Sequence, residues 1–550
     1  MDNSEVFQNT LHATITGDAW LQKVMLDTVD TIISWLDPTS IIQFSSACKA
    51  FRAAIINDRP SWIRALRSIS TELSLAPKSF DGQQTTGDLR RITTRPSRLI
   101  QALKQPERPL TVKTRKYVLD YGDDIPPWSS RRTAPLYLPP KLLPGGRWMV
   151  SGVVNWAMLS TQLFLWDCTQ SPSPDVPLRP VAKYMWDGWQ PRIIHRDWIQ
   201  MQFCGPNSVT FGWSLMGNSG RSIMYDAFCI IWSDDGNDPP AFSPSGQLLL
   251  GRDICLPDDD TATPTYQLQG DYLIIDTIQS LFIWNWREGL VGRIDNRQHE
   301  WGNGKGFLAA ILPPDLFIIP HDVGEILVIE IPKLHPVGTP ASLEPIRVTP
   351  IHSHPFLGKV EGLRFSRIFQ LGSWKRPSDQ PDITVFQSLR SNDTSLFNII
   401  SLRPKPGSSD FPSFTPQTLS TTLLGTPPEH FDRMVTVEGV GTITLQNLDL
   451  EDREDLPDEV ETQTIKALFW PFADDGTFGE STAREFDIQY PYPTSTAPSG
   501  HISRLCLVSG TAVIETEMIY ASSKTQIVAI AGVGNDAGGT PGIGCSPQPL

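Results

Sequence analysis

The sequence predicts an α+β multidomain protein in which a small N-terminal helical domain precedes a large, mainly-β domain. Two observations predict this class: amphipathic helical spacing near the N-terminus, and short β-type runs that recur from about residue 137 onward. The expected boundaries are 18–70 for the helical domain, 71–136 for a helical and basic linker, 137–533 for a β-propeller-like domain of about seven blades, and 534–550 for a disordered tail.

The composition favours many short strands over a mostly helical fold. The 550 residues include 48 prolines, 40 glycines and 17 tryptophans, and only 19% of the residues are charged. Such a composition is typical of strands joined by tight turns. A formal net charge of -14 opposes binding to nucleic acid or to an anionic membrane, so we expect neither as a partner.

The seven cysteines are scattered and form no CxxC pair, so we expect no zinc ribbon, no redox motif and no cofactor. The N-terminal stretch lacks the basic end and apolar run of a secretory signal. No apolar stretch is long enough to span a bilayer without interruption by proline. We therefore expect an intracellular protein of the cytoplasm or nucleus, with reduced thiols.

Residues 24–69 are expected to form three or four short helices with almost no loop between them. The first helix has apolar residues at the spacing of one helical face. At Asp37 and Pro38 a new helix begins, because aspartate caps free amides and proline suits a first turn. A unit of about 45 residues is marginally stable alone, and its apolar side chains cover more than one face. Some of them are therefore expected to pack on another polypeptide or on the rest of the chain.

The spacing of these residues resembles that of an F-box. The shared features are a helix that ends at Leu36, the pair Asp37-Pro38, Cys48 followed by basic and aromatic residues, and Trp62 about ten residues further on. Val24-Met25 stands in place of the family's Leu-Pro start, and Asp27 in place of a common Glu. The resemblance implies binding to a Skp-family adaptor and, through it, to a cullin-RING ubiquitin ligase. The residues that it assigns to adaptor binding are Val24, Met25, Val29, Ile32, Ile33, Leu36, Pro38, Ile41, Ile42, Phe44, Cys48, Phe51 and Trp62.

A strand-turn-strand pattern recurs through the β domain. Gly146–Val150 precedes Gln162–Asp167, and Gly270–Ile274 precedes Ser280–Asn285, each second strand ending in Trp and a short polar residue. Looser copies and further strand groups occur at Tyr225–Ser233, Gly324–Ile331, Gly362–Leu371 with Leu396–Leu402, Met434–Leu448 and His501–Ala531. The spacing is that of propeller blades with insertions. The stretch LLPGGRWMV followed by LFLWD also resembles the C-terminal region of a large group of fungal F-box proteins.

The basic residues of the linker are not interleaved with aromatic ones, so we interpret them as a solvated face rather than a nucleic-acid site. The chain has no GxSxG, P-loop or HExxH motif. We expect no catalysis by this chain. The favoured function is the substrate receptor of an SCF-type ubiquitin ligase, which holds an unknown target on the propeller.

Two alternatives remain open from the sequence. One is a propeller scaffold whose N-terminal helices pack on its own body and bind no ubiquitin machinery. The other, less favoured, is a carbohydrate-active propeller enzyme that uses paired carboxylates. Its candidate acids are Asp187, Asp197, Asp234, Asp235 and Asp271.

Overall fold

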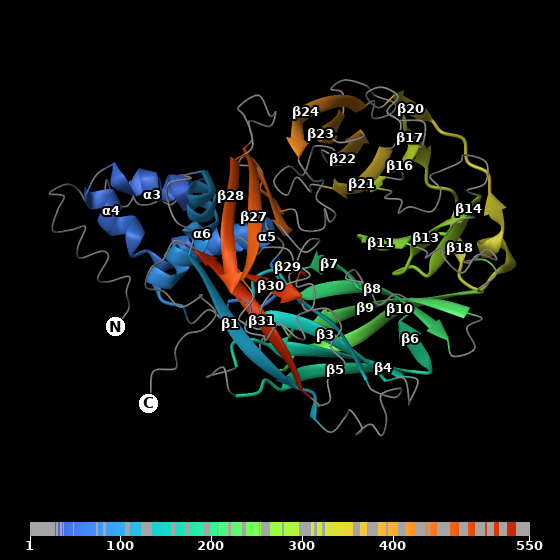
Figure 1. Cartoon of the computed structure of the whole chain (residues 1–550), viewed down its shortest axis with the longest axis horizontal. Coiled ribbons are helices and arrows are strands. Elements are labelled where there is room, and N and C mark those ends of the chain that lie inside the picture. The colour runs from blue at the N-terminus through green and yellow to red at the C-terminus, as the bar shows by residue number, and fades with distance from the viewer. Residues whose placement is uncertain are drawn as a thin grey trace.

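The structure is a computed structural model with helices at one end and antiparallel sheets over the rest (Figure 1). The residues that it describes are 28, 31–33, 36, 38–47, 49–72, 75–80, 84–104, 111–122, 135–155, 160–170, 176–191, 199–205, 207–217, 222–233, 238–251, 254, 265–277, 280–295, 310–312, 316–321, 325–355, 363–370, 383–391, 394–404, 414–424, 435–437, 441–447, 462–471, 482–489, 501–502, 511–515 and 525–534. Side-chain burial is described only as far as residue 351.

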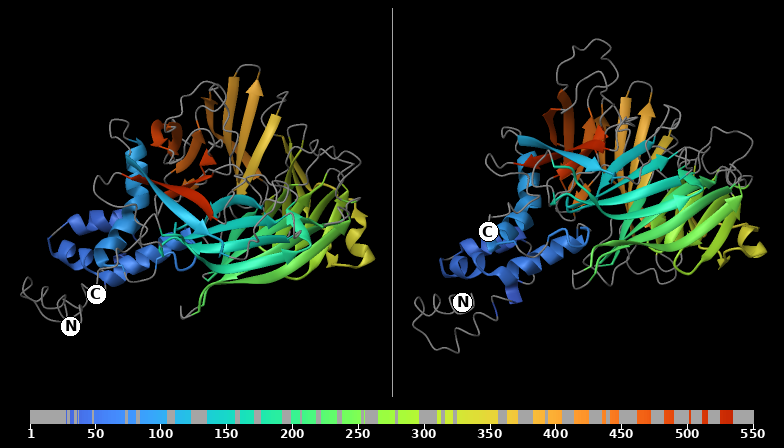
Figure 2. Two further views of the ribbon diagram at one scale, coloured as in Figure 1. Left: turned by 60° about the horizontal axis from the view of Figure 1, so that its bottom comes forward. Right: turned by 90° about the horizontal axis from the view of Figure 1, so that it is seen from below.

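The helices are short and locally capped. They are α3 (Pro38–Ser46), α4 (Lys49–Ile56), α5 (Arg59–Glu72) and α6 (Thr86–Lys104). Asp58 caps α5 by accepting the Ser61 backbone N–H at 3.0 Å. Thr85 and Asp88 form a reciprocal capping box on α6, with both N–H to side-chain oxygen distances at 3.2 Å. In all views α3 and α4 lie at the end of the molecule away from the sheets (Figures 1 and 2).

The strands of the described residues form seven sheets, numbered here in chain order. The first sheet contains β2 (Leu136–Leu142), β3 (Trp148–Asn155), β4 (Ser160–Asp167) and β5 (Pro180–Asp187). The second contains β6 (Trp189–Pro191), β7 (Gln200–Gly205), β8 (Ser208–Gly217), β9 (Ser222–Ile231) and β10 (Ala241–Gly251). The third contains β11 (Thr265–Gln269), β12 (Tyr272–Asp276), β13 (Ser280–Asn285), β14 (Leu290–Asp295), β18 (His335–Pro336) and β19 (Pro345–Ile346), with a short 3-10 helix at Pro340–Leu343.

The remaining sheets have four strands each. The fourth contains β15 (Ala310–Leu312), β16 (Leu316–His321), β17 (Glu325–Glu330) and β20 (His352–Pro355). The fifth contains β21 (Leu363–Gln370), β22 (Ile383–Ser391), β23 (Thr394–Pro404) and β24 (Phe414–Leu424), and the sixth β25 (Val435–Val437), β26 (Gly441–Asn447), β27 (Thr462–Pro471) and β28 (Thr482–Gln489). The seventh contains β1 (Thr111–Asp120), β31 (Thr525–Gly534), β30 (Thr511–Glu515) and β29 (His501–Ile502). The prediction of a mainly-β domain is therefore confirmed.

The first four sheets pack face to face in succession, and the central strands of the first three are buried on both sides. In β9, Met224, Phe228 and Ile230 belong to a core shared with the first sheet. Their neighbours in sequence, such as Ile223 and Tyr225, belong to a core shared with the third sheet. A further core joins the third sheet to the fourth. Because side chains alternate between the two faces of a strand, a strand covered on both faces needs a nearly continuous apolar run, and β9 has one that only Asp226 interrupts between Ile223 and Ile231.

The recurring tryptophans are core residues at the ends of these strands. Trp166 and Trp284 are the penultimate residues of β4 and β13, each strand ends in a short polar residue, and both rings are buried. The polar residue accepts a backbone N–H of the following turn: Asp167 from Thr169 and Asn285 from Glu288, each at 3.0 Å. The strands predicted around both repeats are confirmed.

The seventh sheet joins the two ends of the β domain. β1 pairs antiparallel with β31 from Thr111↔Gly534 to Asp120↔Thr525, and the two lie side by side as blue and red arrows (Figure 1). The same strand reaches the first sheet, because Tyr117, Leu119 and Tyr121 belong to a buried cluster with residues of β2, β3 and β4. One strand thus contacts both the last and the first sheet.

β1 lies within residues 71–136, for which the sequence predicts a helical, basic linker. The strand reads TVKTRKYVLD, in which basic residues obscure the alternation of its apolar end.

Burial raises the pKa of Tyr121 far above its ordinary value, and its hydroxyl lies 2.9 Å from the Ser151 hydroxyl. The polar atom of this buried ring is therefore satisfied within the first sheet.

No helix of the described chain combines the length and the apolar character needed to cross a membrane.

Leu119→Ala tests the contact of β1 with the first sheet. Leu119 is fully buried, and its neighbours Val118 and Asp120 exchange backbone hydrogen bonds with Leu178 of 2.7 and 2.9 Å. We expect a loss of about 2–5 kcal/mol in the free energy of unfolding, measured by chemical denaturation. Val118→Ala, at a half-buried position of the same strand, is the control and should cost less. Equal losses would show that β1 is not held by the first sheet.

Candidate functional site

The residues that the F-box resemblance assigns to adaptor binding divide into a buried group and an exposed group. Ile33, Ile41 and Trp62 are 4%, 1% and 0% exposed, and they form one cluster with Ile55, Ala65 and Leu89. The Trp62 ring N–H donates to the Ile55 carbonyl at 3.1 Å. These side chains hold the helices to one another, so their substitution would disturb the whole helical unit.

Ile32 and Ile42 face outward instead. They are 37% and 38% exposed, whereas most large apolar side chains of the described chain are buried. Ile42 belongs to α3, which lies at the end of the molecule away from the sheets (Figure 1). Each of the two isoleucines is an exposed apolar side chain next in sequence to a residue of the helical core, and a partner protein is able to cover such side chains.

The other residues assigned to adaptor binding are half-buried or lie outside the described part of the chain. Leu36, Pro38 and Phe44 are half-buried, and Leu36 and Phe44 pack on the edge of the helical core. Val24, Met25, Val29 and Cys48 lie outside the described residues. Phe51 belongs to α4, and its side chain lies outside the described part of the chain.

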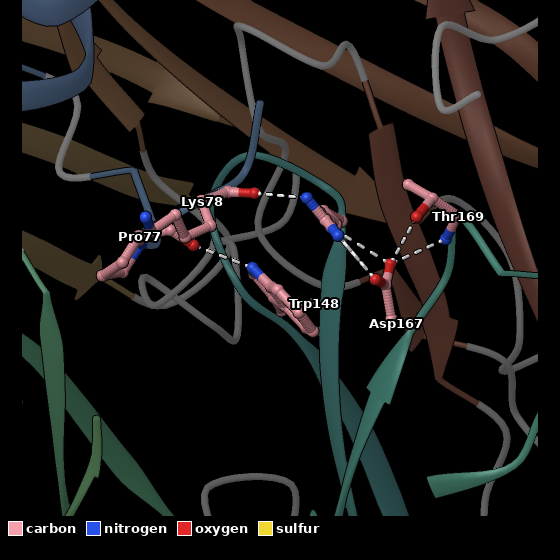
Figure 3. A network of polar contacts seen from close by, with 6 residues as sticks. Pro77, Lys78, Trp148, Asp167 and Thr169 are labelled. Carbon is pink, nitrogen blue, oxygen red and sulfur yellow. Dashed lines mark hydrogen bonds and ion pairs between the residues drawn. The ribbon is translucent and has the colours of Figure 1, made fainter. Parts of the chain in front are cut away.

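The helical unit is attached to the first sheet by an anchor, defined here as residues 76–79 together with the turn 144–148. The Ala76 N–H donates to the Pro144 carbonyl at 2.7 Å, and the Trp148 ring N–H donates to the Pro77 carbonyl at 2.8 Å. The Arg147 guanidinium donates to the Lys78 carbonyl at 2.8 Å (Figure 3). The anchor thus joins segments about 70 residues apart in the sequence.

The backbone of the anchor requires special conformations on both sides. Lys78 has φ 54° and Gly145 has φ 107°, in the left-handed region that favours glycine. A Cβ atom on Gly145 would collide with the Ser79 side chain. Glycine at 145 therefore permits the close approach of the two segments.

An ion pair within the first sheet orients Arg147 for this contact. Arg147 Nη2 lies 2.8 Å from Asp167 Oδ2, and the two side chains are only 20% and 3% exposed. Arg147 Nε lies 3.2 Å from both carboxylate oxygens, and the guanidinium covers the Trp148 ring with 4.7 Å to its centroid. Thr169 donates both its N–H and its hydroxyl to Asp167 Oδ1 (Figure 3). These contacts together fix the plane of the guanidinium, and a lysine ammonium could not make the same set of contacts.

The acids considered for glycoside hydrolysis do not form a pair among the described residues. Asp187 is exposed at the end of β5 in the first sheet. Asp271 precedes β12 of the third sheet and pairs with Arg287 at 3.0 Å. Asp197, Asp234 and Asp235 lie outside the described residues. In the described part of the chain, no group of three or more His, Cys, Asp or Glu side chains could hold a metal ion.

Comparison with known proteins gives no family. No family model matches the chain, and no curated protein sequence matches it. The solved structure of the GH93 α-L-arabinofuranosidase of Fusarium graminearum with arabinobiose is similar at a TM-score of 0.23 and 11% identity, covering 68% of this chain and 97% of that one. The Nup133 β-propeller domain of Vanderwaltozyma polyspora gives a TM-score of 0.24 and 9% identity, covering 77% and 98%. These scores are too low to inform the function.

Arg147→Ala tests the anchor. The substitution removes the donor to Lys78 and leaves the Asp167 carboxylate buried without its cation, so we expect the free energy of unfolding to fall by about 3 kcal/mol. Faster proteolytic separation of the helical unit from the sheets should accompany the loss. Arg287→Ala is the matched control, because its pair with Asp271 is 57% and 40% exposed and should contribute less than about 1 kcal/mol. Similar losses in both variants would contradict the role given to Arg147.

Proposed function

We propose that this chain is the substrate-receptor subunit of an SCF-type cullin-RING ubiquitin ligase, acting inside the cell. In this proposal the helical unit docks on a Skp-family adaptor, and the β domain holds a target protein. The observation that carries the proposal is the outward position of Ile32 and Ile42 in a segment with F-box spacing. α3, which carries Ile42, lies at the end of the molecule away from the sheets, so an adaptor bound there leaves the sheets accessible to a second protein (Figure 1).

The chain itself performs no chemistry in this function. A target bound to the β domain is held beside the ubiquitin-charged enzyme that the adaptor and cullin bring. Ubiquitin transfer then depends on effective concentration and orientation rather than on a catalytic side chain of the receptor. The anchor supports such a role, because it ties the docking helices to the first sheet through Arg147 and Trp148.

The β domain is a seven-bladed propeller in this proposal. Support comes from the seven sheets in chain order and from the apolar cores that join the first four face to face. In a ring of sheets the last one must lie beside the first. β1 meets that need, because it pairs with β31 of the seventh sheet and packs on the first.

A scaffold that binds no ubiquitin machinery is the second candidate. The anchor supports the scaffold as well, because the anchor attaches the helical unit to the first sheet of the same chain. In addition, α6 contacts β27 and β28 of the sixth sheet. The two candidates differ in whether an adaptor covers Ile32 and Ile42.

The variant Ile32→Asp/Ile42→Asp separates these candidates. Charge on two exposed apolar positions should weaken adaptor binding at least about tenfold, measured by calorimetry or co-purification, while thermal unfolding stays unchanged. Leu249→Asp in β10 is the matched control, because Leu249 is 59% exposed on a distant element and its substitution should leave adaptor binding intact. Ile33→Asp is unsuitable as a test, because Ile33 is a core residue. Unchanged adaptor affinity in the folded double variant would favour the scaffold.

Electron cryo-microscopy of the 61.2 kDa chain in its adaptor complex tests the architecture. We expect a ring of seven sheets with the helical unit attached beside the junction of the first and seventh sheets. An open arc, or a different number of sheets around a centre, would contradict the propeller.

A further inference from the structure

Asp226 is a fully buried acidic residue between the first and second sheets. It lies on β9 in the same alternating series as Met224, Phe228 and Ile230, whose side chains belong to the core shared with the first sheet. The surrounding core is apolar and aromatic, with the Trp186 and Trp213 ring centroids 4.9 Å apart. A carboxyl group in such an interface needs strong partners to remain ionised.

The partners of Asp226 are neutral. The Trp186 ring N–H, from β5 of the first sheet, donates to Asp226 Oδ2. Asp226 Oδ1 has no hydrogen-bond partner among the described residues. Its cross-strand neighbours are Trp213 on β8 and Gln247 on β10.

No cation offsets the Asp226 charge within the described interface. The strands that flank β9 read SVTFGWSLMG and AFSPSGQLLLG and contain no charged residue. From the first sheet, Tyr184 is the titratable group that interacts with Asp226, and its own pKa is raised by burial and by the Asp226 charge. Burial raises the pKa of Asp226 to about 7, although hydrogen bonds from Trp186 and Gln247 act in the opposite direction.

We propose that the contact between the first and second sheets is a pH-sensitive joint, in which Asp226 is protonated while the sheets are packed and loosens them when it ionises. The neutral carboxyl fits the apolar core and accepts the Trp186 hydrogen bond from across the joint. The ionised carboxylate requires water or a rearrangement of Trp186 and Gln247. The joint is a property of the fold and does not depend on binding to an adaptor.

The direction of the pH effect follows from the two protonation states. The unfolded chain loses the Asp226 proton near its ordinary pKa of 3.8, whereas the folded chain keeps it up to a pKa of about 7. Between these values the folded state binds the extra proton, so the free energy of unfolding falls as pH rises. The fall ends once pH passes the folded pKa, because both states are then ionised.

Thermal unfolding of the full-length protein from pH 5.5 to pH 8.5 tests the proposal. We expect the wild-type midpoint to fall by several degrees between pH 5.5 and about 7 and to level off above that pH, and Asp226→Asn to lose this part of the pH dependence. Asp187→Asn is the control, because Asp187 is exposed on β5 and its substitution should leave the wild-type profile unchanged. The same pH profile in wild type and Asp226→Asn would overturn the proposal.

A second variant keeps the test decisive if Asp226→Asn does not fold. Trp186→Phe removes a donor that favours the ionised carboxylate, so the fall in midpoint should move to higher pH. Intrinsic fluorescence gives an independent readout, because Trp186 contacts the titrating group. A wild-type fluorescence titration near neutrality that Trp186→Phe leaves unchanged would also contradict the joint.

Discussion

The pairing of β1 with β31 is the constraint on which the arrangement of the sheets depends. Each of the other sheets is built from strands near one another in the sequence, so local hairpins account for them. β1 pairs with the last strand of the β domain, and its buried face also packs on the first sheet. The ten residues of β1 thus supply both the backbone pairing with β31 and apolar contacts with the first sheet.

The helical unit depends on the sheets through a second contact, the anchor. Trp148 serves both structures, because its ring lies in the core between the first and second sheets while its N–H binds Pro77 of the helical segment. Arg147 is held by Asp167, which also caps the turn after β4. The same short polar residue therefore ends a strand and positions the side chain that reaches the helices. If the chain is the receptor proposed above, this connection fixes the position of the adaptor-binding helices relative to the first sheet.

The sequence allowed the strands of the repeats to be predicted, because Trp166 and Trp284 mark continuous apolar strands followed by a turn. It did not allow β1 to be predicted, since Lys113, Arg115 and Lys116 made the segment resemble a solvated linker. The sequence has two isoleucine pairs, Ile32-Ile33 and Ile41-Ile42, and helical spacing does not show which residue of each pair is buried. In the structure the packing around Trp62 buries Ile33 and Ile41 and leaves the other residue of each pair exposed. The anchor was not predicted either, although Gly145 and Gly146 before Arg147 indicate a tight turn. Contacts over such sequence distances leave no periodic signal.

The position of β1 also has a consequence for synthesis of the chain in the cell. β1 leaves the ribosome roughly 400 residues before β31, which corresponds to a delay on the order of tens of seconds at ordinary translation rates. During that interval its hydrogen-bonding edge has no native partner, although the helices that precede it are able to fold. Contacts of such long range are formed late and slowly. The nascent chain therefore carries an unpaired, partly basic strand until β31 has been synthesised, and its positive charges oppose premature association with other strands.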